Sequence, residues 1–202
     1  MKLLWIQFRD ELLKMFARRR TYIGYGAFVL VELVILLMLQ LPQAQKSIRS
    51  LLTNNGFDFT PFYGGLTLAV ITVVFTFTLL GALYLALVAG DIIAKEVEDG
   101  TMRMVLNRPI SRARLLLIKW AACTVYTFTL IFFLGAMALI AATIYRGQIG
   151  DLFVFVPEFA IFAVYDMPEG LWRYAQAMLF LAIVTQVISN MAFMFSCFGM
   201  KP

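Results

Sequence analysis

Residues 90–119 hold many of the side chains in this 202-residue chain that are able to do chemistry. Carboxylates come first, at Asp91, Glu96, Glu98 and Asp99, and basic residues follow. Carboxylate oxygens are the ligands that Mg²⁺ prefers, so one hypothesis is a membrane-embedded enzyme with a metal site here. No nucleophile–base pair accompanies the carboxylates. The chain contains no histidine, which removes the usual proton shuttle and the zinc-protease motif.

A second chemical feature is Glu32, which lies within a long apolar run, about 15 Å from either end at 1.5 Å per residue. A carboxylate in that position is costly and is expected to face protein or water. Glu32 therefore lines a translocation path, carries a proton, or is a buried structural group. Gln186 and Asn190 share one helical face of a later apolar run. They either form hydrogen bonds between helices or contact a substrate.

The elements that position these groups are membrane-spanning helices. Four apolar runs reach or exceed the roughly 20 residues that cross a bilayer. Only helices and closed barrels satisfy their backbone in lipid, and the alternation typical of a barrel is absent. The prediction is an all-α polytopic transmembrane helix bundle in a single domain over residues 1–202, with spans at about 22–41, 66–89, 120–145 and 176–198.

Charge sets the expected orientation. The N-terminal segment and residues 90–119 carry most of the lysines and arginines, whereas the other two loops carry few. This positive-inside pattern places the N-terminus and residues 90–119 in the cytoplasm. Lipid headgroups explain the net charge of +5, so no nucleic-acid partner is expected. Residues 1–20 read as an amphipathic helix in the headgroup plane, with Asp10 and Lys14 one turn apart.

The two remaining loops are expected outside the cell. Residues 42–64 contain turn residues without helical periodicity, so a loop is expected there. Residues 147–174 are rich in aromatic side chains, and their apolar part is broken by Pro157 and Glu158. An interfacial or re-entrant segment fits this pattern, serving either as an anchor or as an outer gate.

Residues 90–119 also have a definite local pattern. The second span is expected to continue through Glu96 and to stop at Gly100. Thr101 then caps a short helix that Pro109 ends, and Ser111 caps the next helix. The short helix has one apolar face, formed by Met102, Val105 and Leu106. A partner that pushed on this helix would move both adjoining spans.

This segment resembles the signature of type-2 ABC transporter permeases. Residues 94–112 contain, in order, a glutamate, an acidic pair, Gly-Thr, a short apolar helix and Pro-x-Ser-Arg, and Lys119 follows at the start of the next span. In outline, the resemblance extends over the whole chain. The family usually has six spans and this chain has room for four. The chain is therefore either incomplete at its C-terminus or a shortened four-span relative, and the end at Lys201-Pro202, directly after the fourth span, favours an incomplete chain.

The resemblance implies a function. It implies a non-catalytic permease subunit of an exporter in a prokaryotic cytoplasmic membrane, pairing with a second permease copy as a homo- or heterodimer. The segment would be a coupling helix on a separate ATP-binding subunit that holds ATP and Mg. No glycine here is followed by lysine, so this chain lacks a phosphate-binding loop and no cofactor is expected in it. The implied coupling residues are Glu96, Gly100, Thr101, Met102, Arg103, Val105, Leu106 and Pro109.

Two other classes of function stay open from the residues themselves. An ion-coupled carrier or channel would use Glu32, would need no ATPase and would respond to pH. The membrane enzyme would depend on the carboxylate cluster of residues 90–119. The substrate of an exporter is not legible in the sequence, since the spans carry no diagnostic charged pocket.

Overall fold

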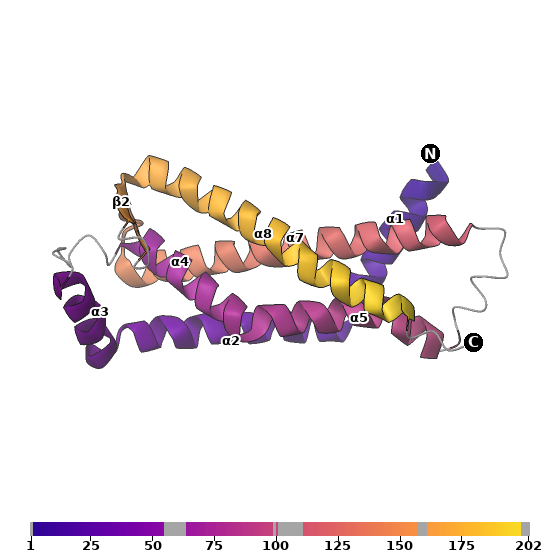
Figure 1. Ribbon diagram of the computed structural model, residues 1–202, viewed down its shortest axis with the longest axis horizontal. Coiled ribbons are helices and arrows are strands. Elements are labelled where there is room, and N and C mark those ends of the chain that lie inside the picture. Colours follow the sequence, from indigo (N-terminus) through magenta and orange to yellow (C-terminus); the bar gives the residue numbers. More distant parts are fainter. Residues whose placement is uncertain (1, 55–63, 99, 101–110, 157–160, 199–202) are drawn as a thin grey trace. The chain divides into compact units, whose positions relative to one another are not determined.

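The computed structural model describes residues 2–54, 64–98, 100, 111–156 and 161–198. Within these ranges, four helices are long and apolar enough to cross a membrane. They are α2 (Arg19–Leu39), the helix over Gly65–Glu98, α7 (Arg112–Arg146) and α8 (Met167–Phe198). Figure 1 colours them along the sequence, from indigo to yellow. The prediction of an all-α polytopic transmembrane bundle is confirmed.

The long helices differ in length relative to the thickness of a bilayer. α2 has 21 residues and is about 32 Å long, close to the roughly 30 Å of a bilayer's hydrocarbon core. α7 has 35 residues and is about 52 Å long, so part of it must lie outside the hydrocarbon. The helix begins at Arg112, directly after the expected cap residue Ser111 and before the start of the predicted span at Trp120. Its charged first turns are the part that benefits most from water.

The helix over Gly65–Glu98 contains a π-helical turn. It consists of α4 (Gly65–Thr76), the π turn η2 (Phe77–Gly81) and α5 (Ala82–Glu98). The Phe77 N–H is shared between the carbonyls of Val73 and Val74, so α4 ends on a three-centre hydrogen bond directly before the π turn. A π turn of this kind accommodates one extra residue without ending the helix.

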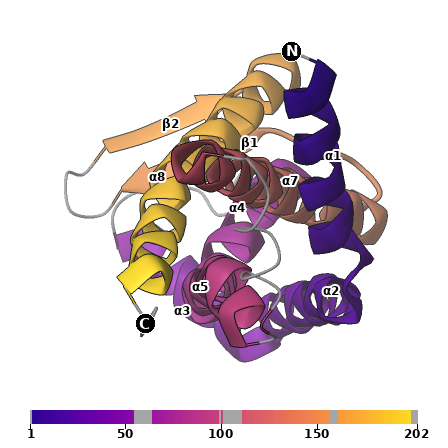
Figure 2. The same ribbon diagram turned by 90° about the vertical axis from the view of Figure 1, so that its right-hand side faces the viewer.

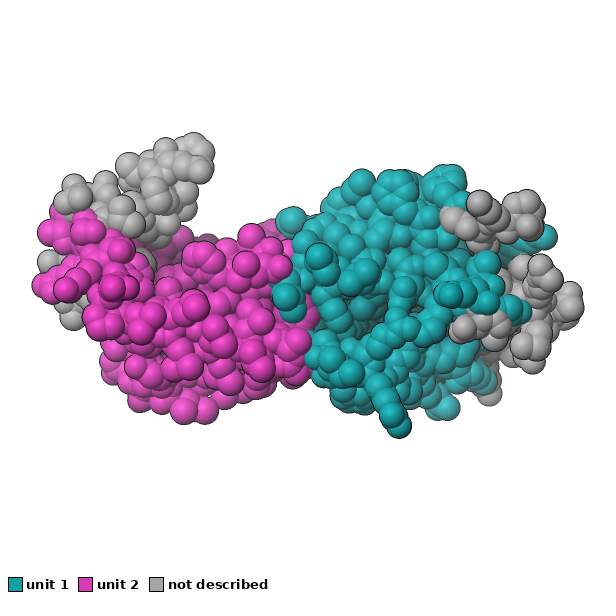
Figure 3. Space-filling view, turned by 90° about the horizontal axis from the view of Figure 1, so that it is seen from below, with its two compact units in different colours: residues 1–25, 80–131, 181–202 teal, residues 26–79, 132–180 magenta. Residues whose placement is uncertain are grey.

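The chain divides into two compact units, shown in two colours in Figure 3. Unit 1 comprises residues 1–25, 80–131 and 181–202. Its core includes fully buried side chains from α5 and α7, among them Leu85, Ile93, Tyr126 and Leu130. Unit 1 also contains α1 (Lys2–Ala17), the helix expected over residues 1–20.

Unit 2 comprises residues 26–79 and 132–180. Its core brings together buried side chains from α2, α4 and α7, among them Phe28, Leu66, Val73 and Leu134. The long helices α2, α7 and α8 contribute residues to both units.

The segment after α2 is helical, so the expectation of a loop over residues 42–64 is wrong for its first part. Helix α3 runs over Pro42–Asn54. Proline is well tolerated in the first turn of a helix because no N–H is needed there. The hydroxyls of Ser47 and Thr53 donate to carbonyls four residues earlier, at 3.1 and 2.6 Å, so these polar side chains find partners within the helix. Residues 55–63 lie outside the described residues.

A β-hairpin precedes α8, which the sequence analysis did not predict. Strands β1 (Leu152–Val156) and β2 (Ile161–Tyr165) pair antiparallel, with Leu152 opposite Tyr165. Both strands are short runs of β-branched and aromatic residues, the composition that favours strands. The hairpin is joined to the start of α4, because Phe153 N–H donates to Thr67 Oγ1 at 2.9 Å and Leu66 N–H donates to the Ile149 carbonyl at 2.9 Å.

Candidate functional site

A buried ion-pair cluster joins both ends of the 90–119 segment. Lys119, near the start of α7, is only 1% exposed. Its Nζ lies 2.7 Å from Glu96 Oε1, in the last turns of α5, and 3.2 Å from Glu11 Oε2 in α1. Glu11 also receives the Lys14 ammonium at 2.9 Å. We call Glu11, Lys14, Glu96 and Lys119 the Lys119 cluster; Figure 2 shows α1 beside α7 in this unit.

The charges in this cluster favour one another strongly enough to offset burial. Burial alone raises the pKa of the Glu11 carboxyl, but Lys119 and Lys14 together hold that pKa below its ordinary value. Burial lowers the pKa of Lys14, and its hydrogen bond and attraction to Glu11 raise it to above the usual value. Both groups are therefore held in their charged forms at neutral pH.

The cluster fixes three elements to one point. A buried ion pair adds little net stability by itself, but removing one partner leaves an uncompensated charge and is strongly destabilising. α1, α5 and α7 are therefore constrained to remain together at Lys119. The sequence analysis noted Lys119 as part of the motif and Asp10 and Lys14 as one turn apart. In the structure, the Lys14 ammonium also forms an ion pair with Glu11, which the sequence analysis did not name.

α8 contacts the same part of α5 through one hydroxyl. Ser196 Oγ donates to the Gly90 carbonyl at 2.5 Å and accepts from the Ala94 N–H at 3.1 Å. These two backbone groups are the ones that pair with each other in a regular helix. At the same level, Arg20 pairs with Asp91 across exposed side chains, which is worth little in water.

The loop's ends agree with the expected local pattern. α5 ends at Glu98, and Gly100 has a φ of +69°, the left-handed conformation that glycine adopts readily after a helix. Ser111 directly precedes α7, and its carbonyl accepts the Leu115 N–H at 3.2 Å. The other implied coupling residues lie outside the described residues: Thr101, Met102, Arg103, Val105, Leu106 and Pro109.

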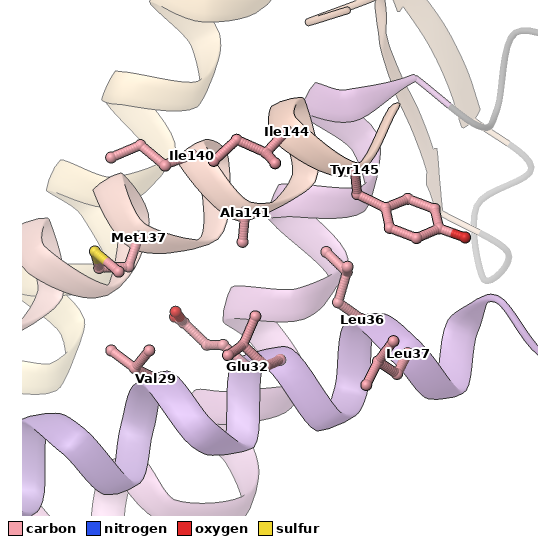
Figure 4. A pocket seen from close by; sticks show the side chains of 10 residues that line it. Val29, Glu32, Leu36, Leu37, Met137, Ile140, Ala141, Ile144 and Tyr145 are labelled. Carbon is pink, nitrogen blue, oxygen red and sulfur yellow. The ribbon is translucent and has the colours of Figure 1, made fainter. Parts of the chain in front are cut away.

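Glu32 lies in unit 2 and is only 2% exposed. Its Oε1 has no hydrogen-bond partner among the described residues. The side chain borders a cavity of about 420 Å³ between α2 and α7, and Figure 4 shows it extending from α2 toward α7. A buried carboxyl beside an empty apolar space agrees with both expected roles, a path-lining group and a buried structural group.

Gln186 and Asn190 lie in unit 1 and link α8 to α7. Asn190 Oδ1 accepts hydrogen bonds from Trp120 Nε1 and from Gln186 Nε2, both at 2.9 Å. Gln186 Nε2 also lies 3.0 Å from Thr124 Oγ1. These contacts support the interpretation as interhelical hydrogen bonds. A role of these amides in a translocation path stays a prediction.

The hypothesis of a metal-dependent enzyme gains no support from the described residues. No group of three or more acidic or cysteine side chains there is arranged to hold a metal ion. Two of the four carboxylates are paired with cations, Asp91 with Arg20 and Glu96 with Lys119. Asp99 lies outside the described residues.

Comparison with known proteins gives one match. The sequence model of a family described as "ABC-2 family transporter protein" matches residues 9–200. This match covers nearly all of the described helices. A search of curated proteins found no match.

Proposed function

Since the chain belongs to the ABC-2 family of transporter proteins, and is thus a multi-pass membrane permease subunit of an ABC transporter, we propose that it is the permease of an exporter driven by a separate ATP-binding subunit. Membership of this family implies pairing with such a subunit. We propose that this chain is not itself catalytic and that ATP and Mg are bound by the partner. The absence of any Gly-Lys pair supports this, because a phosphate-binding loop needs one.

The Lys119 cluster is the observation that carries the proposal for coupling. Glu96 and Lys119 flank the short segment with the family-like signature, and their ion pair joins the last turns of α5 to the start of α7. Glu11 adds α1 to the same point. A force that a partner applies to the segment would therefore reach α1, α5 and α7 together. In this mechanism, Thr101, Met102, Arg103, Val105, Leu106 and Pro109 contact the ATPase.

The arrangement in the membrane follows from charge and family. We propose that the N-terminus and residues 90–119 face the cytoplasm of a prokaryote, where basic residues remain preferentially. Two permease copies, identical or different, would form the transport unit. Glu32, Gln186 and Asn190 are candidate path residues, and the class of substrate stays open within this proposal.

Co-purification with an ATPase tests the coupling proposal. The native protein would be tagged in its own membrane, extracted gently and analysed by mass spectrometry. We expect an ABC-type ATPase to accompany the native chain and to be lost, by about tenfold or more, from a Met102→Asp/Leu106→Asp variant. Burying two carboxylates in an apolar contact costs several kcal/mol, enough for such a loss.

The matched control is Met104→Asp, because residue 104 falls on the opposite face of the expected short helix. It should retain the ATPase. Absence of any ATPase from intact native membranes would contradict the proposal, and so would equal loss from both variants.

A second candidate function is an ion-coupled carrier that uses Glu32. It is favoured by one observation, the buried Oε1 without a hydrogen-bond partner in the described part of the chain. This candidate predicts that no ATPase co-purifies and that transport in vesicles depends on an ion gradient. The same co-purification experiment therefore separates the two functions.

A further inference from the structure

The cavity beside Glu32 has the composition of a ligand site. It lies within unit 2, between one face of α2 and one face of α7. The α2 face includes Val29 and Leu36, and the α7 face includes Met137, Ala141 and Ile144. These residues recur at helical three- and four-residue spacing on both helices, which normally produces close packing. Instead, a space of about 420 Å³ remains, at the lower end of the range of small-ligand pockets.

Glu32 is the only acidic or basic residue that lines this cavity. Apart from Glu32, every lining side chain is apolar or aromatic, and no lysine or arginine lines the space. Glu32 is buried, and its Oε1 accepts no hydrogen bond from any described residue. Leaving a buried polar group without a partner is costly, and leaving a buried carboxylate without a counter-charge costs much more. Figure 4 shows this side chain extending into the space between the two helices.

We propose that this cavity binds a lipophilic amine. The amine can take a proton from Glu32 or bind as the ammonium, and in either case an N–H donates a hydrogen bond to Glu32 Oε1. Its alkyl body would fill the space lined by the two helix faces. A lipophilic acid or phosphate is disfavoured, because no lysine or arginine lines the cavity to balance its negative charge. The proposal concerns binding alone, so it does not depend on the ATPase partner or on transport.

A pair of matched photoreactive probes tests the proposal. One is decylamine with a diazirine in its chain, and the other is decanol with the same diazirine. The purified full chain would be placed in phosphatidylcholine nanodiscs, which have no net charge and so do not attract amines electrostatically. After irradiation, mass spectrometry would identify labelled peptides. We expect the amine, at pH 7.5, to label residues 29–37 and 137–145 at least tenfold more than decanol does, with competition by unmodified decylamine.

Three variants separate charge from shape. Glu32→Gln should reduce labelling by the amine at least tenfold and change labelling by decanol less than twofold. Ala141→Phe fills the cavity and should reduce labelling by both probes. Glu169→Gln is the matched control, because it makes the same change at an exposed carboxylate of α8 that pairs with Arg173. It should label like the native chain.

Each contrary outcome is decisive. Equal labelling by the amine and the alcohol in the native chain would show that the cavity accepts any alkyl chain, and would overturn the proposal. Unchanged amine labelling of Glu32→Gln would do the same. If Glu32→Gln fails to give monodisperse protein, the comparison of probes in the native chain and in Ala141→Phe still decides. None of these outcomes bears on the coupling proposal, because the discs contain no ATPase.

Discussion

At the scale of the residue, Lys119 is a buried charge that links α1, α5 and α7. Its ammonium is buried, yet it meets two carboxylates that come from different helices. Such an arrangement contributes geometry more than net stability, since desolvation offsets much of the attraction. Its value is therefore expected to show when one partner is removed.

We predict that Lys119→Met destabilises the protein by about 3–5 kcal/mol, because Glu11 and Glu96 then lose their buried counter-charge. Thermal unfolding in detergent would be followed with a thiol-reactive dye, which reports exposure of the buried free Cys123. All proteins would carry Cys197→Ser so that a single thiol reports.

Two further variants interpret that result. Adding Glu11→Gln and Glu96→Gln to Lys119→Met should recover most of the lost stability, because the uncompensated charges are gone. Arg173→Met breaks an exposed pair with Glu169 and should cost less than about 1 kcal/mol. If Lys119→Met costs no more than Arg173→Met, the cluster does not hold α1, α5 and α7 together.

At the scale of the element, the start of α4 lies close to the backbone of the segment that precedes β1. A Cβ built on Gly65 would lie 2.7 Å from the Ile149 carbonyl oxygen and 2.8 Å from that of Gln148. Both are backbone atoms, which cannot move aside as a flexible side chain can. This close approach therefore requires a residue without a side chain at position 65, and Gly64 beside it meets the Asp151 carbonyl oxygen in the same way.

We predict that Gly65→Ala destabilises the protein by about 1–3 kcal/mol, since the new methyl forces the two backbones apart. The same thermal assay would measure it. Gly26→Ala is the matched control, because nothing lies within 4 Å of a Cβ built there. That variant, in the middle of α2, should be neutral or stabilising by up to about 1 kcal/mol. Equal effects of the two changes would contradict the close approach at Gly65.

The long helices were predictable and the short elements were not, for a physical reason. The apolar composition of a run such as residues 120–145 is enough to predict a span, whatever elements pack beside it. The pairing of β1 with β2, by contrast, depends on residues that find partners across a turn, and five-residue strands carry little periodicity. α3 was missed because turn residues at its end and beyond it, Asn54 to Gly56 and Pro61, were taken to describe the whole of residues 42–64.

The candidate site was predictable in part for the same reason. Glu96 and Lys119 stand in one local motif, so their importance was legible. Glu11 lies 108 residues before Lys119, and no local pattern reveals a contact over that separation. Glu32 was conspicuous as a lone carboxylate in an apolar run, but its cavity arises from the meeting of two helix faces.

At the scale of the whole molecule, the membrane is the solvent that suits the apolar surfaces of the four long helices. Large apolar side chains on them are exposed in the isolated chain, for example Leu83 and Ile144 at 65% and 78%. Lipid or a second permease copy would cover such surface. The direction in which the chain crosses the membrane then decides which ends of these helices meet a cytoplasmic partner.

We predict that Ser111→Cys is labelled by a membrane-impermeant maleimide only from the cytoplasmic side, and Thr53→Cys only from the other. Both positions are exposed and lie outside the four long helices. Intact cells and inside-out vesicles would be compared, in a background with Cys123→Ser and Cys197→Ser. The opposite result at both positions would invert the orientation expected from the lysines and arginines. Labelling of both positions from the same side would show that the chain does not cross the membrane once between residues 53 and 111.

The π turn at Phe77–Gly81 displaces the series of buried residues along the second span. α4 buries Leu66, Ala69, Val73 and Thr76, a series that a regular helix would continue near residues 80, 84, 87 and 91. After the π turn, the buried positions are Gly81, Leu85, Ala89, Ile92 and Ile93, one or two residues later than that series. The π turn accounts for such a displacement, because it holds one extra residue. A helical wheel drawn through residues 65–98 at a regular 100° per residue would therefore misassign the buried face in the second half of this span.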